Sequence, residues 1–126
     1  MSVTATIVRS CKIDSESYQT GTETVTGDVA QIISDTIANA AGVTTAVLPF
    51  EFAKLKALFL LADEDLDVTF LDGASNVSFN LTADTPTVWT DADGLACPFG
   101  ADVTGANATN ASGNNCTFTA RILTTA

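Results

Sequence analysis

Three cysteines and fifteen acidic residues are the candidate reactive groups of this chain, which contains no histidine. Without histidine, the common Ser-His-Asp and Cys-His catalytic arrangements and the most frequent metal ligand are excluded. Cys97, in the segment LACPFG, has only Asp91, Asp93 and Asp102 near it in the sequence. Carboxylates raise the pKa of a neighbouring thiol and so suppress the thiolate. We therefore interpret Cys97 as a loop thiol, and we expect that the protein is not an enzyme.

The acidic segment ADEDLD (62–67) is a second candidate site. It holds Asp63, Glu64, Asp65 and Asp67, and loop positions are counted from Asp63. Its alternate carboxylates could in principle surround a hard cation such as calcium. An EF-hand loop also requires glycine at its sixth position and glutamate at its twelfth, and here these positions are Val68 and Ala74. An EF-hand is excluded. We predict a solvated turn between two strands, with an irregular calcium site as the alternative, and we expect no cofactor.

Two aromatic residues are candidates for a contact with another subunit. Trp89 is the only tryptophan, and it either packs between sheets or anchors a subunit contact, where aromatic residues concentrate binding energy. Phe99, beside Pro98 in an otherwise polar loop, is a comparable candidate. We predict Trp89, Phe99 and Pro98 as residues of an interface with another subunit or with a larger protein assembly.

The charge balance limits the classes of partner. The formal net charge is −10, with fifteen acidic and five basic residues, so no basic patch is available for a phosphate backbone. We expect no nucleic-acid binding. No apolar run is long enough to span a membrane, and the first residues, MSVTATIVRSCKID, lack the pattern of an export signal. We expect a protein made in a cytoplasm, with no membrane partner.

The elements that would position these residues are mostly strands. Twenty threonines favour a pleated sheet, and period-two alternation predicts strands at 3–13, 66–71, 76–82, 87–90, 101–109 and 116–122. The polar segment 14–28 is predicted to be a hairpin loop or a pair of short edge strands. The stretch Asn107–Leu123 is predicted to form a closing hairpin around the turn NASGNN.

Two apolar segments fit both a helix and a strand. Residues 28–41 carry a helical stripe with a possible cap at Asp28, and we favour a strand there because the surrounding segments are β. Residues 50–62 are predicted to form one helical turn, within 51–56, followed by a buried strand from about Lys56. Together these patterns predict one all-β domain over residues 1–126, a β-sandwich or jelly roll with at most one short helix.

The polar and thiol side chains fit this scaffold. Cys11 and Cys116 fall on the apolar phase of predicted strands, and we interpret both as buried thiols without a disulfide. Five of the seven asparagines begin an Asn-x-Ser/Thr triplet: Asn76, Asn80, Asn107, Asn110 and Asn115. We interpret these triplets as strand-surface and turn residues and not as glycosylation sites.

Three segments together carry a resemblance to a known class of proteins. They are AKLKALFLLADEDLDVTFLD, VWTDADG and PFGADVTGANATNASGNNCTFTARIL, within residues 53–123. A strand before an acidic turn, a DVT strand, a lone tryptophan and a closing NASG turn resemble small structural proteins of tailed bacteriophages, and capsid decoration (cement) proteins in particular. The first fifty residues show no such match.

The resemblance implies a virion protein on the capsid surface that binds the major capsid protein and stabilises the head. It also implies a homo-oligomer, with a trimer favoured. A tail or head-completion subunit is the alternative within the same class. A carbohydrate-binding β-sandwich module is the alternative from another class, and such a module would show exposed aromatic side chains or a calcium site.

Overall fold

The computed structural model describes residues 2–13, 16–40, 42–73, 75–91 and 96–126, with side chains described outside residues 9–23. Within these ranges the chain forms strands and one 3-10 turn. They are β1 (Val3–Ile13), β2 (Glu16–Gly27), β3 (Val29–Ile37), β4 (Gly42–Thr44), η1 (Phe52–Lys54), β5 (Leu55–Ala62), β6 (Leu66–Leu71), β7 (Val77–Leu81), β8 (Thr87–Thr90), β9 (Gly105–Thr109) and β10 (Cys116–Thr124).

Eight of these strands form a sandwich of two four-stranded antiparallel sheets. One sheet has the order β3-β10-β5-β8 and the other the order β4-β9-β6-β7. Successive strands therefore pass repeatedly from one sheet to the other, as in a jelly roll. The prediction of an all-β sandwich with a jelly-roll-like arrangement and at most one short helix is confirmed.

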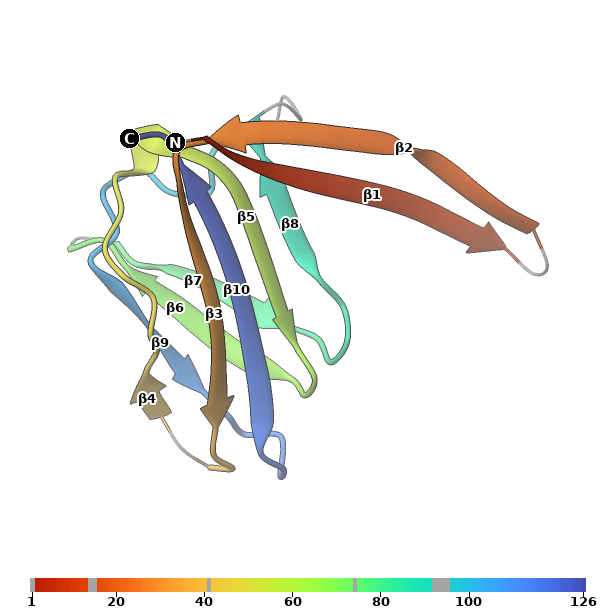
Figure 1. The fold of residues 1–126 in the computed structure, drawn as a ribbon. Helices are drawn as coiled ribbons and strands as arrows, with labels where there is room; N and C mark the ends of the chain where they lie inside the picture. The colour runs from red at the N-terminus through yellow and green to blue at the C-terminus, as the bar shows by residue number, and fades with distance from the viewer. Residues whose placement is uncertain (1, 14–15, 41, 74, 92–95) are drawn as a thin grey trace.

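The strands β1 and β2 form a separate two-stranded antiparallel sheet, here called the arm, which projects from the sandwich (Figure 1). The prediction of a loop or short edge strands over 14–28 was wrong, because β2 is twelve residues long. Its composition is polar, but threonine suits an exposed pleated strand. An arm with little to bury does not need the apolar alternation on which the prediction relied.

The prediction of a closing hairpin at Asn107–Leu123 was also wrong. β9 and β10 are strands as expected, but β9 pairs with β4 and β6 whereas β10 lies between β3 and β5. The NASGNN turn therefore leads the chain from one sheet to the other. Periodicity identifies a strand and its buried face, but it does not identify the strand that pairs with it.

Both ambiguous apolar segments adopt the conformations that we favoured. β3 is a strand that pairs along its whole length with β10, and η1 is a single turn leading directly into β5. The extended conformation of β3 is fixed by its pairing with β10, which places Ile33 and Ile37 in the core.

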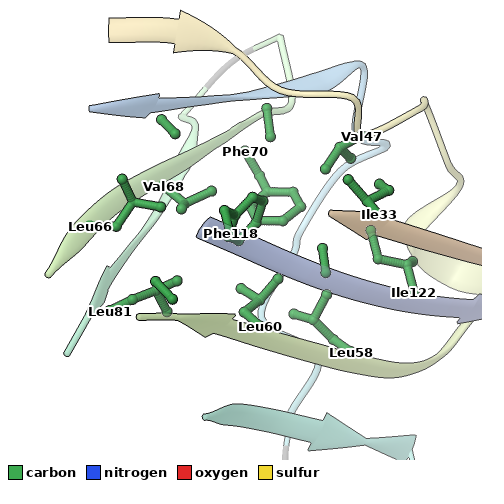
Figure 2. Close-up of a cluster of buried hydrophobic side chains, with 14 of the residues drawn as sticks. Ile33, Val47, Leu58, Leu60, Leu66, Val68, Phe70, Leu81, Phe118 and Ile122 are labelled. Carbon is green, nitrogen blue, oxygen red and sulfur yellow. The ribbon is translucent and has the colours of Figure 1, made fainter. Parts of the chain in front are cut away.

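The core lies between the two sheets. Figure 2 shows Leu58 and Leu60 of β5 and Phe118 and Ile122 of β10 pointing toward the β6 side chains that include Phe70. Phe70 is fully buried and has its ring centroid 5.1 Å from Phe99, 5.6 Å from Phe79 and 6.4 Å from Phe50. These four phenylalanine rings pack against one another as one part of the core.

Candidate functional site

The three residues predicted to form an interface lie within the chain's own packing. Phe99 is 3% exposed and Trp89 is 9% exposed, and both belong to the main core cluster. Pro98 is half-buried. Trp89 thus packs in the core, which was one of its two interpretations. The two aromatic side chains have little surface left for a partner, so a contact surface has to be sought elsewhere.

Cys97 is half-buried at the edge of the core and forms no disulfide. Two of its three acidic neighbours in sequence have other partners: Asp91 forms an ion pair with Lys56 at 2.7 Å, and Asp102 accepts a hydrogen bond from the backbone N–H of Phe52 at 3.2 Å. Asp93 lies outside the described residues. Nothing described here activates the Cys97 thiol.

Cys116 is the buried thiol that the alternation predicted, at 0% exposure. Its Sγ donates to the carbonyl oxygen of Glu64 at 3.7 Å. Burial raises the pKa of this thiol, and Asp63 nearby raises the pKa further. Cys116 is therefore a core residue that stays protonated. The side chain of Cys11 lies outside the described residues.

The acidic turn is used to hold neighbouring backbone in place. Asp63 accepts a hydrogen bond from the N–H of Thr117 at 2.7 Å, and Asp65 accepts one from the N–H of Ala83 at 2.9 Å. Among the described residues, no group of three or more metal-ligating side chains forms a cation site. The carboxylates of this turn link the β5–β6 connection to β10 and to the segment after β7.

Asn110 is the buried polar residue that organises the β9–β10 connection. Its Nδ2 donates to the carbonyl oxygens of Ile37 at 2.9 Å and Asn114 at 2.7 Å, while its Oδ1 accepts from the N–H and hydroxyl of Ser112 at 3.0 and 2.7 Å. The side chain is 1% exposed. The interpretation of this asparagine as a turn residue is confirmed, and its role is to tie the end of β3 to the turn.

The outer face of sheet β3-β10-β5-β8 points away from the core. It is defined here by three rows of residues that lie side by side across the strands: Ala30, Leu123, Ala57 and Thr90; Ile32, Arg121, Phe59 and Val88; Ser34, Thr119 and Leu61. None of these residues is acidic, and Arg121 is the one charged residue. Because the chain as a whole has a net charge of −10, the lack of acidic residues sets this face apart from the chain's average composition.

A groove opens between the outer face and the arm. Its volume is ≈ 730 Å³. Ile7 and Val8 line it from the arm, and Ile32, Phe59 and Val88 line it from the sheet. Ile32 is 76% exposed and Val8 is 55% exposed. A groove with apolar walls on both sides and exposed isoleucine and valine is suited to contact with another polypeptide.

Among the arm residues with described side chains, those at the base pack against the sandwich. Val25 of β2 is buried with Ala57 and Leu123 of the outer face, and Val3 and Ala5 of β1 pack against this cluster. Where the chain passes from β2 to β3, the N–H of Asp28 donates a hydrogen bond to the carbonyl oxygen of Thr124, at 2.8 Å. The arm is thus attached at one end of the groove and diverges from the face beyond it (Figure 1).

Comparisons with protein-family models, with curated proteins and with solved structures found no match to this chain. Within the described ranges, no helix has the length and hydropathy needed to cross a lipid bilayer.

Sequence reasoning missed the outer face, although a signal for it is present. In β5 the run LKALFLLA is apolar on both phases, and in β3 Ile32 directly precedes Ile33. Two adjacent apolar residues in a strand point to opposite sides, so one of them must face away from the inner core. That signal indicates a second apolar face without saying what covers it.

Proposed function

We propose that this protein is a structural protein of a tailed-phage virion, most specifically a decoration protein that binds the outer surface of the capsid and stabilises it. The observation that supports this proposal is the acid-free outer face beside a projecting arm. Both are suited to contact with other polypeptides. The sequence resemblance over residues 53–123 supports the same class.

The arrangement of polar groups supports a scaffold function. The buried or turn-forming side chains that could have belonged to a reactive site, such as Asp63, Asp65 and Asn110, hold backbone groups in place. Jelly rolls occur in viral capsid and lectin domains. This support comes from fold-level analogy, and a fold hosts many functions.

The stabilising effect of a decoration protein would arise by mass action. A protein that binds the mature shell and not its disassembled subunits shifts the equilibrium toward the shell, by an amount that grows with concentration and with each occupied site. Many identical sites on a capsid make a modest contribution per site large in total. No reactive group is required for this function.

The experiment that tests the proposal is quantitative peptide mass spectrometry of purified virus particles from the source, scaled to the major capsid protein. Hundreds of copies per particle are expected for a decoration protein. A handful of copies, or a number matching one ring, would move the assignment to the tail or the neck. Absence from particles would overturn the virion proposal and favour a carbohydrate-binding module.

A further inference from the structure

We propose that the arm of one copy of this chain docks on the outer face of a second copy, in the groove beside that copy's own arm. The contact involves Ile7 and Val8 from the arm, and Ile32, Phe59, Val88 and Arg121 from the receiving face. The proposal names a partner surface and does not rest on the virion function, because it concerns the isolated protein in solution.

The first argument is that the arm has too little packing of its own. Strands of eleven and twelve residues reach about 37–41 Å at roughly 3.4 Å per residue, and among the arm residues whose side chains the structure describes, the buried packing on the sandwich is the cluster at the base. A two-stranded hairpin alone is marginally stable in water. Beyond its base, the arm therefore gains from a surface supplied by another molecule.

The second argument is the shape and chemistry of the groove. Stacked sheets pack about 10 Å apart, so a two-stranded ribbon that docks on the outer face would form a third layer there. Ile32 and Val8, the exposed apolar residues on the two walls of the groove, would become buried. The docking arm carries apolar side chains of the same kind, which would be buried in the same contact.

The third argument is charge. Residues 28–126 carry twelve of the fifteen acidic residues and only three of the five basic residues, whereas residues 1–27 carry three acidic and two basic residues. Two strongly acidic copies repel each other over most of their surfaces. The nearly neutral arm and the acid-free face are the two regions that can meet with the least repulsion, and Arg121 on the face attracts an acidic chain.

The fourth argument is area. The strands β3, β10, β5 and β8 have nine, nine, eight and four residues, so with about 4.8 Å between strands and about 3.3 Å per residue the outer face has a projected area of about 475 Å². A stable interface buries about 800 Å² on each partner. The face alone falls short of this value, but an exchange in which each copy also inserts its arm reaches it. Because each copy carries both an arm and a groove, such contacts can close into a symmetric assembly.

Sedimentation velocity of the full chain over a range of concentrations tests the proposal. We expect concentration-dependent association of the unmodified protein, and an at least tenfold higher dissociation constant for Ile32→Asp, which places a charge on the apolar wall of the groove. Leu48→Asp is the matched control. Leu48 is also exposed, at 63%, but does not line the groove, so its association should be unchanged.

A mixing experiment distinguishes contact between copies from packing within one copy. Val8→Asp changes the arm, which also forms one wall of its own groove, but leaves the receiving sheet face intact, whereas Ile32→Asp changes that face and leaves the arm intact. A mixture of the two variants should associate more strongly than either variant alone, because the unchanged arm of one variant can still meet the unchanged face of the other. Circular dichroism and urea unfolding verify that each variant is folded. If Ile32→Asp does not fold, Ile32→Thr takes its place, because threonine keeps a β-branched side chain.

Two results would overturn the proposal. One is an unmodified protein that stays monomeric at its highest soluble concentration, and the other is equal association of Ile32→Asp and Leu48→Asp. If the protein is monomeric in solution but present in hundreds of copies on virus particles, the proposed contact between copies is overturned and the proposed virion function stands. In that case the arm and the outer face meet a capsid protein.

Discussion

The sandwich and the arm are made of the same kind of antiparallel strand, yet they are stabilised differently. In β10, the alternate residues Cys116, Phe118, Ala120 and Ile122 are at most 1% exposed. In β1, the equivalent alternation of Val3, Ala5 and Ile7 gives side chains that are only half-buried. The difference lies in what covers the apolar side: a second sheet covers β10, whereas the described side chains of β1 meet the sandwich through the small cluster at the base of the arm. We therefore expect stability to be concentrated in the sandwich.

Truncation in the core should have the largest effect. We expect Phe70→Ala to lower the free energy of unfolding by about 3–5 kcal/mol, because it removes a fully buried ring and leaves a cavity among three other aromatic side chains. Urea unfolding measures the change. The matched variant in the arm, Ile7→Ala, should cost less than about 1 kcal/mol, since its side chain is only half-buried. Similar losses for both variants would show that arm and sandwich share one core.

Removal of the buried amide at the β9–β10 connection should come next. We expect Asn110→Ala to cost about 2–3 kcal/mol, because the buried carbonyl oxygen of Ile37 loses this donor and the carbonyl oxygen of Asn114 keeps only the Ser112 hydroxyl. Asn107→Ala, on the exposed side of β9, should change stability by less than about 0.5 kcal/mol. If the two variants unfold at the same urea concentration, water replaces the amide and this turn is not a fixed part of the sandwich.

The junction between the two regions can be disturbed at Gly27. A Cβ atom there would lie 2.7 Å from the carbonyl oxygen of Thr124 and 2.9 Å from Cγ of Leu123. We expect Gly27→Ala to cost about 1–2 kcal/mol by overpacking, and to speed hydrogen exchange in β1 and β2 more than in β5. Gly100→Ala is the control, because its Cβ would meet nothing within 4 Å. Unchanged exchange in the arm would mean that its base is not held by this contact.

The smallest effect is expected in alkaline solution. Because burial raises the pKa of the Cys116 thiol in the folded protein, the unfolded chain releases this proton at lower pH than the folded chain does. The contribution of the buried thiol to stability is fully present below the unfolded pKa of about 9 and is lost as the pH rises above it.

Urea unfolding between neutral pH and pH values above this range should therefore show a steeper decline for the unmodified protein than for Cys116→Ala. Cys97→Ala serves as the control and should keep the steeper decline, since Cys97 is only half-buried. Parallel curves for the unmodified protein and Cys116→Ala would contradict the assignment of a strongly buried, protonated thiol.

The candidate site was less predictable than the fold. Trp89 and Phe99 were chosen for their size and isolation in sequence, and folding places both in the core. The outer face is made of single residues from four strands, such as Ile32, Arg121, Phe59 and Val88, which become neighbours only through the register of the sheet. No local pattern contains all four residues, so sequence inspection had no means of grouping them.

Local patterns were sufficient for the strands whose structure is local. The hairpin of β6 and β7, the turn that leads into β5 and the inward phase of β10 follow from alternation, turn residues and proline, which act over a few positions. The same chain composition also defines the acidic surface and the absence of a histidine-based site. These features do not depend on which strand lies beside which.

The pairing of distant strands and the length of the arm were decided by tertiary structure. β10 lies between β3 and β5, and β9 lies in the opposite sheet, although β9 directly precedes β10 in the chain. The energy that selects this arrangement comes from burying both inner faces at once, a sum over residues far apart in sequence. The acid-free outer face and its groove are consequences of that selection, because they exist only once the four strands are side by side.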